Sequence, residues 1–156
     1  MTSFPNLPRG LWFEDFETGQ KLTTSGRTVT EADIVNFAGI SGDLHPIHMD
    51  AQYSAGTGYG QRVAHGLLVI SIVTGLVVQT SILDGTLGAF REINNWKFKH
   101  PVFIGDTIRA EAEVGKIIQL KGVDAGMVEI RLKVLNQDDL VVMTGKLTLV
   151  MLSRPA

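Results

Sequence analysis

The stretch LLVISIVTGLVVQTSIL, residues 67–83, contains no Asp, Glu, Lys or Arg, and the expected architecture follows from it. With the residues from Ala64 onward, it predicts a helix that is apolar on every side and ends at Asp84-Gly85, a turn signal. Such a helix must be surrounded by protein or by lipid. The stretch is shorter than the ~20 predominantly apolar residues that cross a bilayer, and no aromatic belt flanks it. We therefore predict a buried helix about 28 Å long.

The C-terminal half of the chain supplies strands to surround this helix. Apolar and charged residues alternate with period two in three segments, which is typical of strands with one buried and one solvated face in an antiparallel sheet. The expected inward-facing residues are Ile108, Ala110, Ala112 and Val114, then Val128, Ile130, Leu132 and Val134, and finally Leu147 and Leu149. Residues 136–139 predict a hairpin loop, residues 93–99 a further strand, and residues 23–28 a weak strand. One helix buried against one curved antiparallel sheet is an α+β, hot-dog-like arrangement, which we expect to form a single domain over residues 1–156.

Length, charge and cysteine content narrow the function. The 156 residues fit one domain. The formal net charge of -2 argues against non-specific nucleic-acid binding, which needs an excess of basic charge. The absence of Cys excludes disulfides, thiolate catalysis and zinc–thiolate sites, and it is compatible with a reducing cytoplasm. The first residues lack a basic patch followed by an apolar core, so we expect no secretory signal. We expect a cytoplasmic protein with no membrane or nucleic-acid partner.

A shorter helix is predicted before the long one. Thr30 is a plausible N-cap with Asp33 three residues later, a relative of the capping box, and Gly39 and Gly42 end the helical pattern. The residues that follow are irregular, and Asp50 could cap one short turn among them.

Two glycine-rich stretches resemble known motifs but lack essential parts of them. GTGYG at residues 56–60 has Gln61 where a dinucleotide fingerprint needs its third Gly, and no βαβ unit surrounds it. GISGD at residues 39–43 has Asp43 in place of the closing Gly of a nucleophile elbow, and it follows a helix rather than a strand. The sequence contains no P-loop Lys and no HExxH pair. We therefore expect no cofactor and no serine hydrolase.

The segment GDLHPIHMD, residues 42–50, places two of the four His beside two carboxylates. Pro46 keeps His45 out of helical geometry, which predicts an extended loop. Asp43 and His48 could converge across this bend, and a carboxylate and an imidazole that hold one water form a general acid/base pair. Asp43 could instead form only an Asx-turn. A metal site that adds His45 to this pair has acceptable ligands, but non-helical backbone gives the three no shared face, so we expect no metal.

The third His lies where the long helix is expected to begin, at His65-Gly66. The first backbone N–H groups of a helix have no intrahelical partners and carry the positive end of its dipole. Gly66 exposes its N–H without side-chain hindrance, so a carbonyl oxygen that gains negative charge would be stabilised there, as in an oxyanion hole. Gly66 could instead permit close packing against the sheet, and His65 could be only a hydrogen-bonding residue at the helix end.

The run from Phe37 to His48 resembles the hydratase-2 signature of the MaoC-like dehydratases, the (R)-specific enoyl-CoA hydratases. That signature is an aromatic residue, a short apolar and small stretch, and then Gly-Asp-x-Asn-Pro-aliphatic-His; here His45 stands where Asn is usual. Three further blocks resemble those of the family, in the family's order: FEDF at 13–16, AHG at 64–66 and FKHPVFIGD at 98–106. Together they span nearly the whole chain. We expect the last block to turn the chain between strands.

The resemblance implies a hot-dog fold, a homodimer or a dimer of dimers, and an acyl-CoA thioester in a tunnel near the dimer interface. It implies that Asp43 and His48 activate the water that adds to Cβ of a trans-2-enoyl thioester. The same pair would give Cα its proton, so that addition is syn and the product is an (R)-3-hydroxyacyl thioester. The N–H of Gly66 would stabilise the enolate-like oxygen.

Substrate contacts are expected from His45, His65 and Arg62. For the phosphates of CoA the candidate cations are Arg62, Arg91, Lys97 and Lys99. The width and depth of the tunnel are expected to depend on the loop of residues 53–62.

Two other functions fit the same residues. A hot-dog thioesterase shares the fold and substrate class, but it releases a free thiol, whereas a hydratase removes the conjugated double bond. A non-catalytic acyl-CoA-binding protein would be stabilised thermally by acyl-CoA without turnover. The presence of both Asp43 and His48 in the expected frame argues against this last function.

Overall fold

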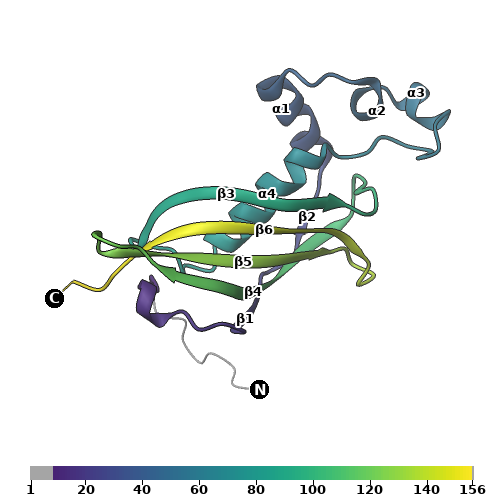
Figure 1. The fold of residues 1–156 in the computed structure, drawn as a ribbon. Helices are drawn as coiled ribbons and strands as arrows, with labels where there is room; N and C mark the ends of the chain where they lie inside the picture. The colour runs from purple at the N-terminus through teal and green to yellow at the C-terminus, as the bar shows by residue number, and fades with distance from the viewer. Residues whose placement is uncertain (1–8, 156) are drawn as a thin grey trace.

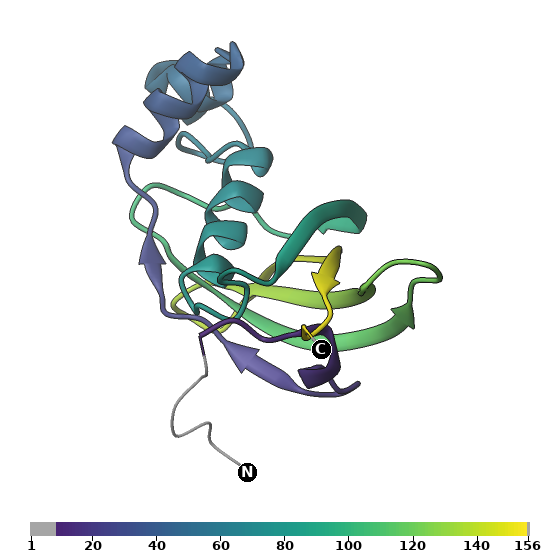
Figure 2. The ribbon, with the colours of Figure 1, turned by 90° about the vertical axis from the view of Figure 1, so that its left-hand side faces the viewer.

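The apolar stretch forms helix α4, which lies against one face of an antiparallel sheet (Figures 1 and 2). The computed structural model describes residues 9–155. The six-stranded sheet has the order β1-β4-β5-β6-β3, and β2 pairs with β4. The strands are β1 (Lys21–Thr23), β2 (Arg27–Thr28), β3 (Leu87–Phe98), β4 (Thr107–Gln119), β5 (Ala125–Leu135) and β6 (Val141–Leu152). The predicted α+β arrangement of one helix against one antiparallel sheet is confirmed.

Three shorter helices precede α4 and project beyond the end of the sheet (Figure 1). The helices are α1 (Glu31–Ser41), α2 (Pro46–Met49), α3 (Ala51–Ala55) and α4 (Gly66–Val78), and a 3-10 turn, η1, covers Phe13–Asp15. We call the first three, with their connections, the α1–α3 segment. In the part of the chain that the structure describes, no helix is long and apolar enough to span a membrane.

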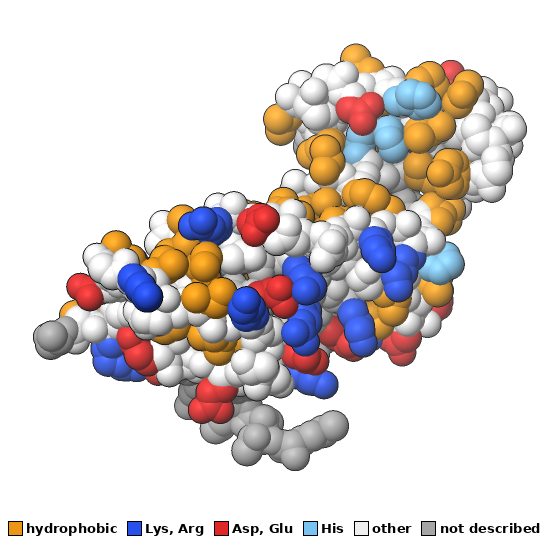
Figure 3. All heavy atoms as spheres, in the orientation of Figure 1, with side chains coloured by type: hydrophobic (Ala, Val, Ile, Leu, Met, Phe, Trp, Pro, Cys, Tyr) orange, Lys and Arg blue, Asp and Glu red, His pale blue; other side chains and the backbone are white. Residues whose placement is uncertain are grey.

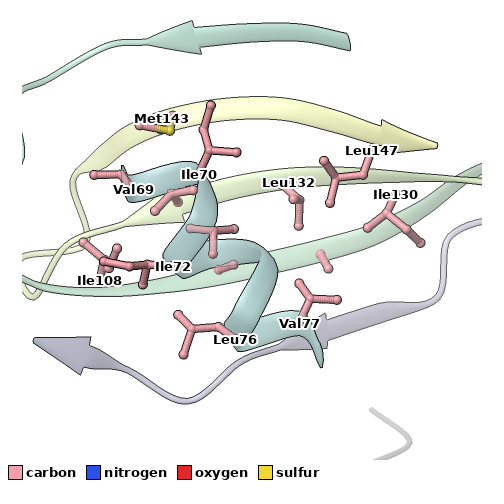
Figure 4. Packing of buried hydrophobic residues seen from close by; sticks show 14 of the residues in the cluster. Val69, Ile70, Ile72, Leu76, Val77, Ile108, Ile130, Leu132, Met143 and Leu147 are labelled. Atoms are coloured by element: carbon pink, nitrogen blue, oxygen red, sulfur yellow. The ribbon is translucent and has the colours of Figure 1, made fainter. Parts of the chain in front are cut away.

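The core lies between α4 and the inner face of the sheet (Figure 4). The buried residues of α4 are Leu68, Val69, Ile70, Ile72, Val73, Leu76 and Val77. They pack with side chains from the sheet, among them Ile108, Ile130, Leu132, Met143 and Leu147. Every residue that the alternation placed on the inner face of β4, β5 or β6 is buried. The period-two pattern therefore identified the inner face correctly.

Helix α4 is shorter than the predicted helix, with 13 residues and a length of about 20 Å. Before it, Ala64 is not helical, and its N–H donates to the carbonyl oxygen of Val102 (2.8 Å). After it, Ile82 and Leu83 are buried within turns. Hydrophobicity marks burial, but the helix ends where the backbone makes other hydrogen bonds or turns.

The prediction that the helix is covered on every side is wrong for one stripe of α4. Leu67, Ser71 and Val78 are exposed, and Thr74 is half-buried. Their spacing of three or four residues puts them on one face of the helix. The sheet covers the opposite face, so this stripe is open in the single chain.

Two predicted strands have different bounds. Residues 23–28 contain the end of β1 and all of β2, with a break between them where Thr24 is buried and its Oγ1 accepts a hydrogen bond from the Ala110 N–H (2.9 Å). Strand β3 begins at Leu87, well before residue 93. The predicted hairpin loop at residues 136–139 is confirmed between β5 and β6.

The predicted N-cap of α1 is confirmed as a complete capping box. The Thr30 side chain accepts a hydrogen bond from the Asp33 N–H (3.3 Å), and the Asp33 carboxylate accepts one from the Thr30 N–H (2.8 Å). Gly42 ends the helix at a φ of 76°, in the left-handed region that Gly adopts without strain. The predicted cap at Asp50 is also confirmed, since its carboxylate accepts hydrogen bonds from two amides at the start of α3.

We expect Leu76→Ala to lower the free energy of unfolding by about 2–5 kcal/mol, because it removes buried methyl groups from the face of α4 that packs on the sheet. Urea unfolding at one protein concentration measures the change. The matched control is Leu140→Ala in the exposed β5–β6 loop, which should change the free energy by less than about 0.5 kcal/mol. Equal losses in the two variants would contradict this description of the core.

Candidate active site

Several hydrogen bonds join the α1–α3 segment to the chain that leads into α4. His48 Nδ1 donates to the carbonyl oxygen of Val63 (2.7 Å), and the Val63 N–H donates to that of Ile47 (3.1 Å). His65 Nε2 donates to the carbonyl oxygen of Asp43 (2.9 Å). These bonds bring the polar loop to the N-terminal end of α4, and Figure 3 shows His side chains gathered in this region.

His48 has the geometry of a proton acceptor. The residue is 8% exposed, and its Nδ1 must carry a proton because a carbonyl oxygen can only accept. In the neutral ring, Nε2 therefore carries the lone pair. The largest influence on the pKa of His48 is its burial, which lowers it. The neighbouring His65 and His45 lower it further. The bond to Val63 and the charge of Asp43 act in the opposite direction. The net lowering favours the neutral ring.

Asp43 approaches His48 from the end of α1. One carboxylate oxygen accepts a hydrogen bond from the His45 N–H (3.3 Å), so the Asx-turn expected as an alternative is present. A carboxylate oxygen also lies within 4.8 Å of a ring nitrogen of His48. A water with two hydrogen bonds of about 2.8 Å at a tetrahedral angle spans about 4.6 Å. The turn and the acid/base interpretation are thus compatible, because the two groups lie close enough for one water to bridge them.

The third residue close to Asp43 and His48 is His65. The metal site considered from the sequence had His45 as its third residue instead. One ring nitrogen of His65 lies within the same 4.8 Å of the other two groups. The rings of His48 and His65 stack, with centroids 3.8 Å apart and planes at 29°. Imidazole lone pairs lie in the ring plane, so stacked rings direct them along nearly parallel planes rather than toward one ion. This geometry favours a hydrogen-bonded cluster over a metal site.

Gly66 is the first residue of α4 and lines a cleft of about 530 Å³ together with His48. The first amides of the helix have no intrahelical acceptor and lie at the positive end of its dipole. A Cβ at Gly66 would lie 2.4 Å from Cε1 of Phe98, so no larger residue fits without displacing that ring. The close-packing interpretation of Gly66 therefore holds, with the Phe98 ring at the end of β3 as the partner.

The cleft has largely apolar walls and a few polar groups. Its apolar lining includes Leu67 and Met143, and its polar lining includes Lys99 and His100 beside His48. Of the four cations considered for the phosphates of CoA, Lys99 is the one that lines this cleft.

Arg62 and His45 make local contacts. The Arg62 guanidinium pairs with Glu31 at the start of α1 (2.6 Å), and its side chain is 18% exposed. His45 is the N-cap of α2, where its Nδ1 accepts a hydrogen bond from the Ile47 N–H (3.3 Å). An Asn side chain at an N-cap supplies the same acceptor, so His45 replaces the usual Asn without loss of the cap. The predicted extended loop is wrong beyond His45, because Pro46 begins α2 and Pro is favourable at the first helical position.

Phe98 and His100 reach the site although their local sequence carries no chemical signal. Phe98 covers Gly66, and His100 lines the cleft wall. Both lie where β3 ends, and only the curvature of the sheet brings this end to the start of α4. The signal that could have found them is the block FKHPVFIGD itself, one of those that resemble the family.

Comparison with known families identifies the family of this chain. The family model described as "MaoC like domain" matches residues 15–136. This chain belongs to the MaoC-like family.

The relatives of this MaoC-like chain include hydratases and dehydratases. It is 36% identical over 110 residues to the (R)-specific enoyl-CoA hydratase of Rhodospirillum rubrum, and the match covers 70% of this chain and 74% of that protein. It is 33% identical over 110 residues to the 3-hydroxybutyryl-CoA dehydratase of Methylorubrum extorquens, and the match covers 70% of this chain and 68% of that protein. It is also 43% identical over 98 residues to Protein MaoC of Klebsiella aerogenes, but the match spans 63% of this chain and only 29% of that longer protein.

Solved structures show the same fold. A monoamine oxidase regulatory protein from Archaeoglobus fulgidus matches with a TM-score of 0.89 and 36% identity, over 96% of this chain and 100% of that chain. A Mycobacterium tuberculosis protein with a double hotdog fold matches with a TM-score of 0.82 and 20% identity, over 94% of this chain and 45% of that chain. The predicted hot-dog fold is confirmed.

We expect His48 to titrate below the ordinary His value of about 6.5, because burial disfavours the charged ring. A pH titration of its ring proton shifts by NMR measures the midpoint. The control is the same protein unfolded in urea, where the burial is removed and the midpoint should return to the ordinary value. A folded-state midpoint equal to or above the unfolded one would contradict this description.

Proposed function

We propose that this protein is a hydro-lyase that adds water to trans-2-enoyl-CoA thioesters, and in the reverse direction dehydrates (R)-3-hydroxyacyl-CoA thioesters. The enzyme class follows from the MaoC-like family and from relatives that are hydratases and dehydratases. The observation that carries the proposal is the approach of Asp43 and His48 to within 4.8 Å, beside a cleft that reaches the N-terminal end of α4. We place the reaction in the cytoplasm, with which the absence of Cys is compatible.

The first step activates one water between the two side chains. His48 Nε2 accepts a proton from this water while the Asp43 carboxylate accepts its other hydrogen bond. The water oxygen forms a bond to C3 of the enoyl group as the proton leaves. Because the pKa of His48 is lowered, its neutral, proton-accepting form is populated at neutral pH.

The second step places and then removes negative charge. The electron pair of the C2=C3 bond moves toward C2 and the thioester oxygen, where an enolate-like charge develops. The Gly66 N–H, at the positive end of α4, donates to this oxygen. The protonated His48 then returns the proton to C2 on the face from which the water came. Addition is therefore syn and gives the (R)-3-hydroxyacyl thioester.

The cleft accommodates the remainder of the substrate. Its apolar wall, including Leu67 and Met143, suits an acyl chain or the pantetheine arm, and Lys99 and His100 offer donors to the phosphates of CoA. Arg62 supports the loop through Glu31, and His45 supports α2 as its N-cap. In this proposal both act on the shape of the site rather than on the substrate directly.

We further propose that the active form is a homodimer joined along β3. In the described chain β3 is an edge strand that is exposed over most of its length, with Phe90 and Ile93 among its exposed apolar residues. An exposed apolar edge of this length is a template for pairing with another strand. The open stripe of α4 adds apolar surface at Leu67 and Val78. A second copy related by a two-fold axis would cover such surfaces on both chains.

We expect Asp43→Asn and His48→Gln each to slow the hydration of crotonyl-CoA by about 100-fold or more, because each removes one member of the acid/base pair. The loss of absorbance of the conjugated thioester measures hydration, and a thiol reagent measures hydrolysis. Asp124→Asn, in the exposed turn between β4 and β5, is the matched control and should retain full activity.

Three outcomes of this assay would contradict the proposal. Near-normal turnover by a folded Asp43 or His48 variant would remove that residue from the mechanism. Release of thiol from a saturated acyl-CoA would indicate a thioesterase. Thermal stabilisation by enoyl-CoA without any turnover would indicate a binding protein.

We expect the wild-type protein to have a solution mass of about 34 kDa by light scattering, twice the chain mass of 17.0 kDa. Ile93→Glu, which puts a charge in the proposed interface, should shift the protein toward the mass of one chain. Val123→Glu changes an equally exposed apolar residue in the β4–β5 turn and should leave the mass unchanged. A wild-type monomer, or a dimer insensitive to Ile93→Glu, would contradict the β3 interface.

A further inference from the structure

His65 is a buried polar residue whose side chain does not serve its own helix. It is 2% exposed and is the N-cap residue of α4, but its side chain makes no capping hydrogen bond. N-cap side chains ordinarily accept a hydrogen bond from the first turn of the helix. The imidazole is directed instead to the end of α1, where its Nε2 reaches the carbonyl oxygen of Asp43 at 2.9 Å.

This hydrogen bond fixes the protonation of the His65 ring. A carbonyl oxygen only accepts, so Nε2 carries the proton and Nδ1 carries the lone pair. Nδ1 is buried and has no hydrogen-bond partner among the described residues. His65 Nε2 is thus the donor of the bond to Asp43.

The other hydrogen bonds of the Asp43 turn stay within the loop that carries it. The Asp43 N–H donates to the Ser41 side chain (3.2 Å), the Leu44 N–H to the Gly42 carbonyl (3.0 Å), and the His45 N–H to the Asp43 carboxylate (3.3 Å). None of these three bonds connects the loop to α4. Among the described residues, the bond from His65 is the one that joins the backbone of Asp43 to α4.

The same ring also contacts the other member of the catalytic pair. His65 stacks on His48 with ring centroids 3.8 Å apart, and Phe37 lies on it at 5.0 Å. One buried ring therefore bonds to the backbone of Asp43 and packs against the imidazole of His48.

We propose that His65 is a positioning residue that holds Asp43 at its working distance from His48 through the Nε2–H···O=C bond, and that it does not contact the substrate. This inference rests on the proposed hydratase function, because positioning has a catalytic meaning only if Asp43 and His48 react. It replaces the substrate-binding role expected for His65 from the sequence.

The test compares two amides of different reach, His65→Gln and His65→Asn. The Gln amide nitrogen is separated from Cβ by as many bonds as Nε2 of His, so it can still donate to Asp43. The Asn amide is one bond shorter and cannot reach, although Asn is a good N-cap and preserves the start of α4. Both lose the stacking of the imidazole on His48, and the better N-cap of Asn would favour the Asn variant, so a larger loss in His65→Asn reports the missing hydrogen bond.

We expect His65→Asn to lower kcat for crotonyl-CoA by about 30-fold with KM changed less than about 3-fold, because misplacing a catalytic group by about 1 Å has effects of this order. His65→Gln should stay within about 5-fold of the wild type. Because His65 acts through Asp43, its loss should matter little once Asp43 is changed. The double variant that combines Asp43→Asn with His65→Asn should turn over no more than about 3-fold more slowly than the Asp43→Asn variant alone.

Amide hydrogen exchange tests the same inference without turnover. In His65→Asn the amides of residues 43–45 should exchange at least about 10-fold faster, whereas those of β5 should not change. In His65→Gln both regions should match the wild type. If the wild type hydrates no enoyl-CoA, the function fails while this exchange pattern still decides the role of His65.

Specific outcomes would overturn the positioning role. These are equal loss of kcat in the Gln and Asn variants, a rise in KM alone, multiplicative losses in the double variant, or unchanged exchange at residues 43–45 in His65→Asn. A rise in KM alone would instead return His65 to substrate binding.

Discussion

The apolar face of α4 packs against the inner face of the sheet, and this burial fixes how the helix is placed and rotated on the sheet. A helix turns by about 100° per residue, so a shift of one position would move every buried side chain off the sheet. The start of α4 is therefore a rigid reference point in the molecule. Gly66 lies under Phe98 there, and the chain just before it exchanges hydrogen bonds with the α1–α3 segment.

The site uses the difference between two environments that lie a few ångströms apart. His48 is buried and is kept neutral by loss of solvent, with a pKa below its ordinary value. Asp43 stays exposed at the end of α1, where water can reach its carboxylate. A boundary between the core and a projecting segment supplies both conditions within 4.8 Å. Neither the interior of the sheet nor an isolated surface loop would do so.

The exposed surfaces of β3 and α4 set a limit on what hydropathy can reveal. Leu67 and Val78 belong to the same apolar stretch as the buried core residues, yet they lie on the open face of the helix. An apolar side chain can be covered by its own chain or by a second copy, and the hydrophobic effect is the same in both cases. The pattern of the sequence therefore indicates that a residue should be buried, without indicating by what.

The class of fold, the inner face of the sheet, the capping box at Thr30 and the residues of the polar loop could all be predicted from the sequence. These depend on the period of the hydrophobic pattern and on side chains that bond a few residues away, so they are local. Tertiary packing was needed to show that His65 bonds to Asp43, that Phe98 covers Gly66, and that α4 has one open stripe. Those contacts join segments from different parts of the chain, or depend on which face the sheet leaves uncovered. Their geometry is fixed by the packing of α4 against the sheet, which no local pattern encodes.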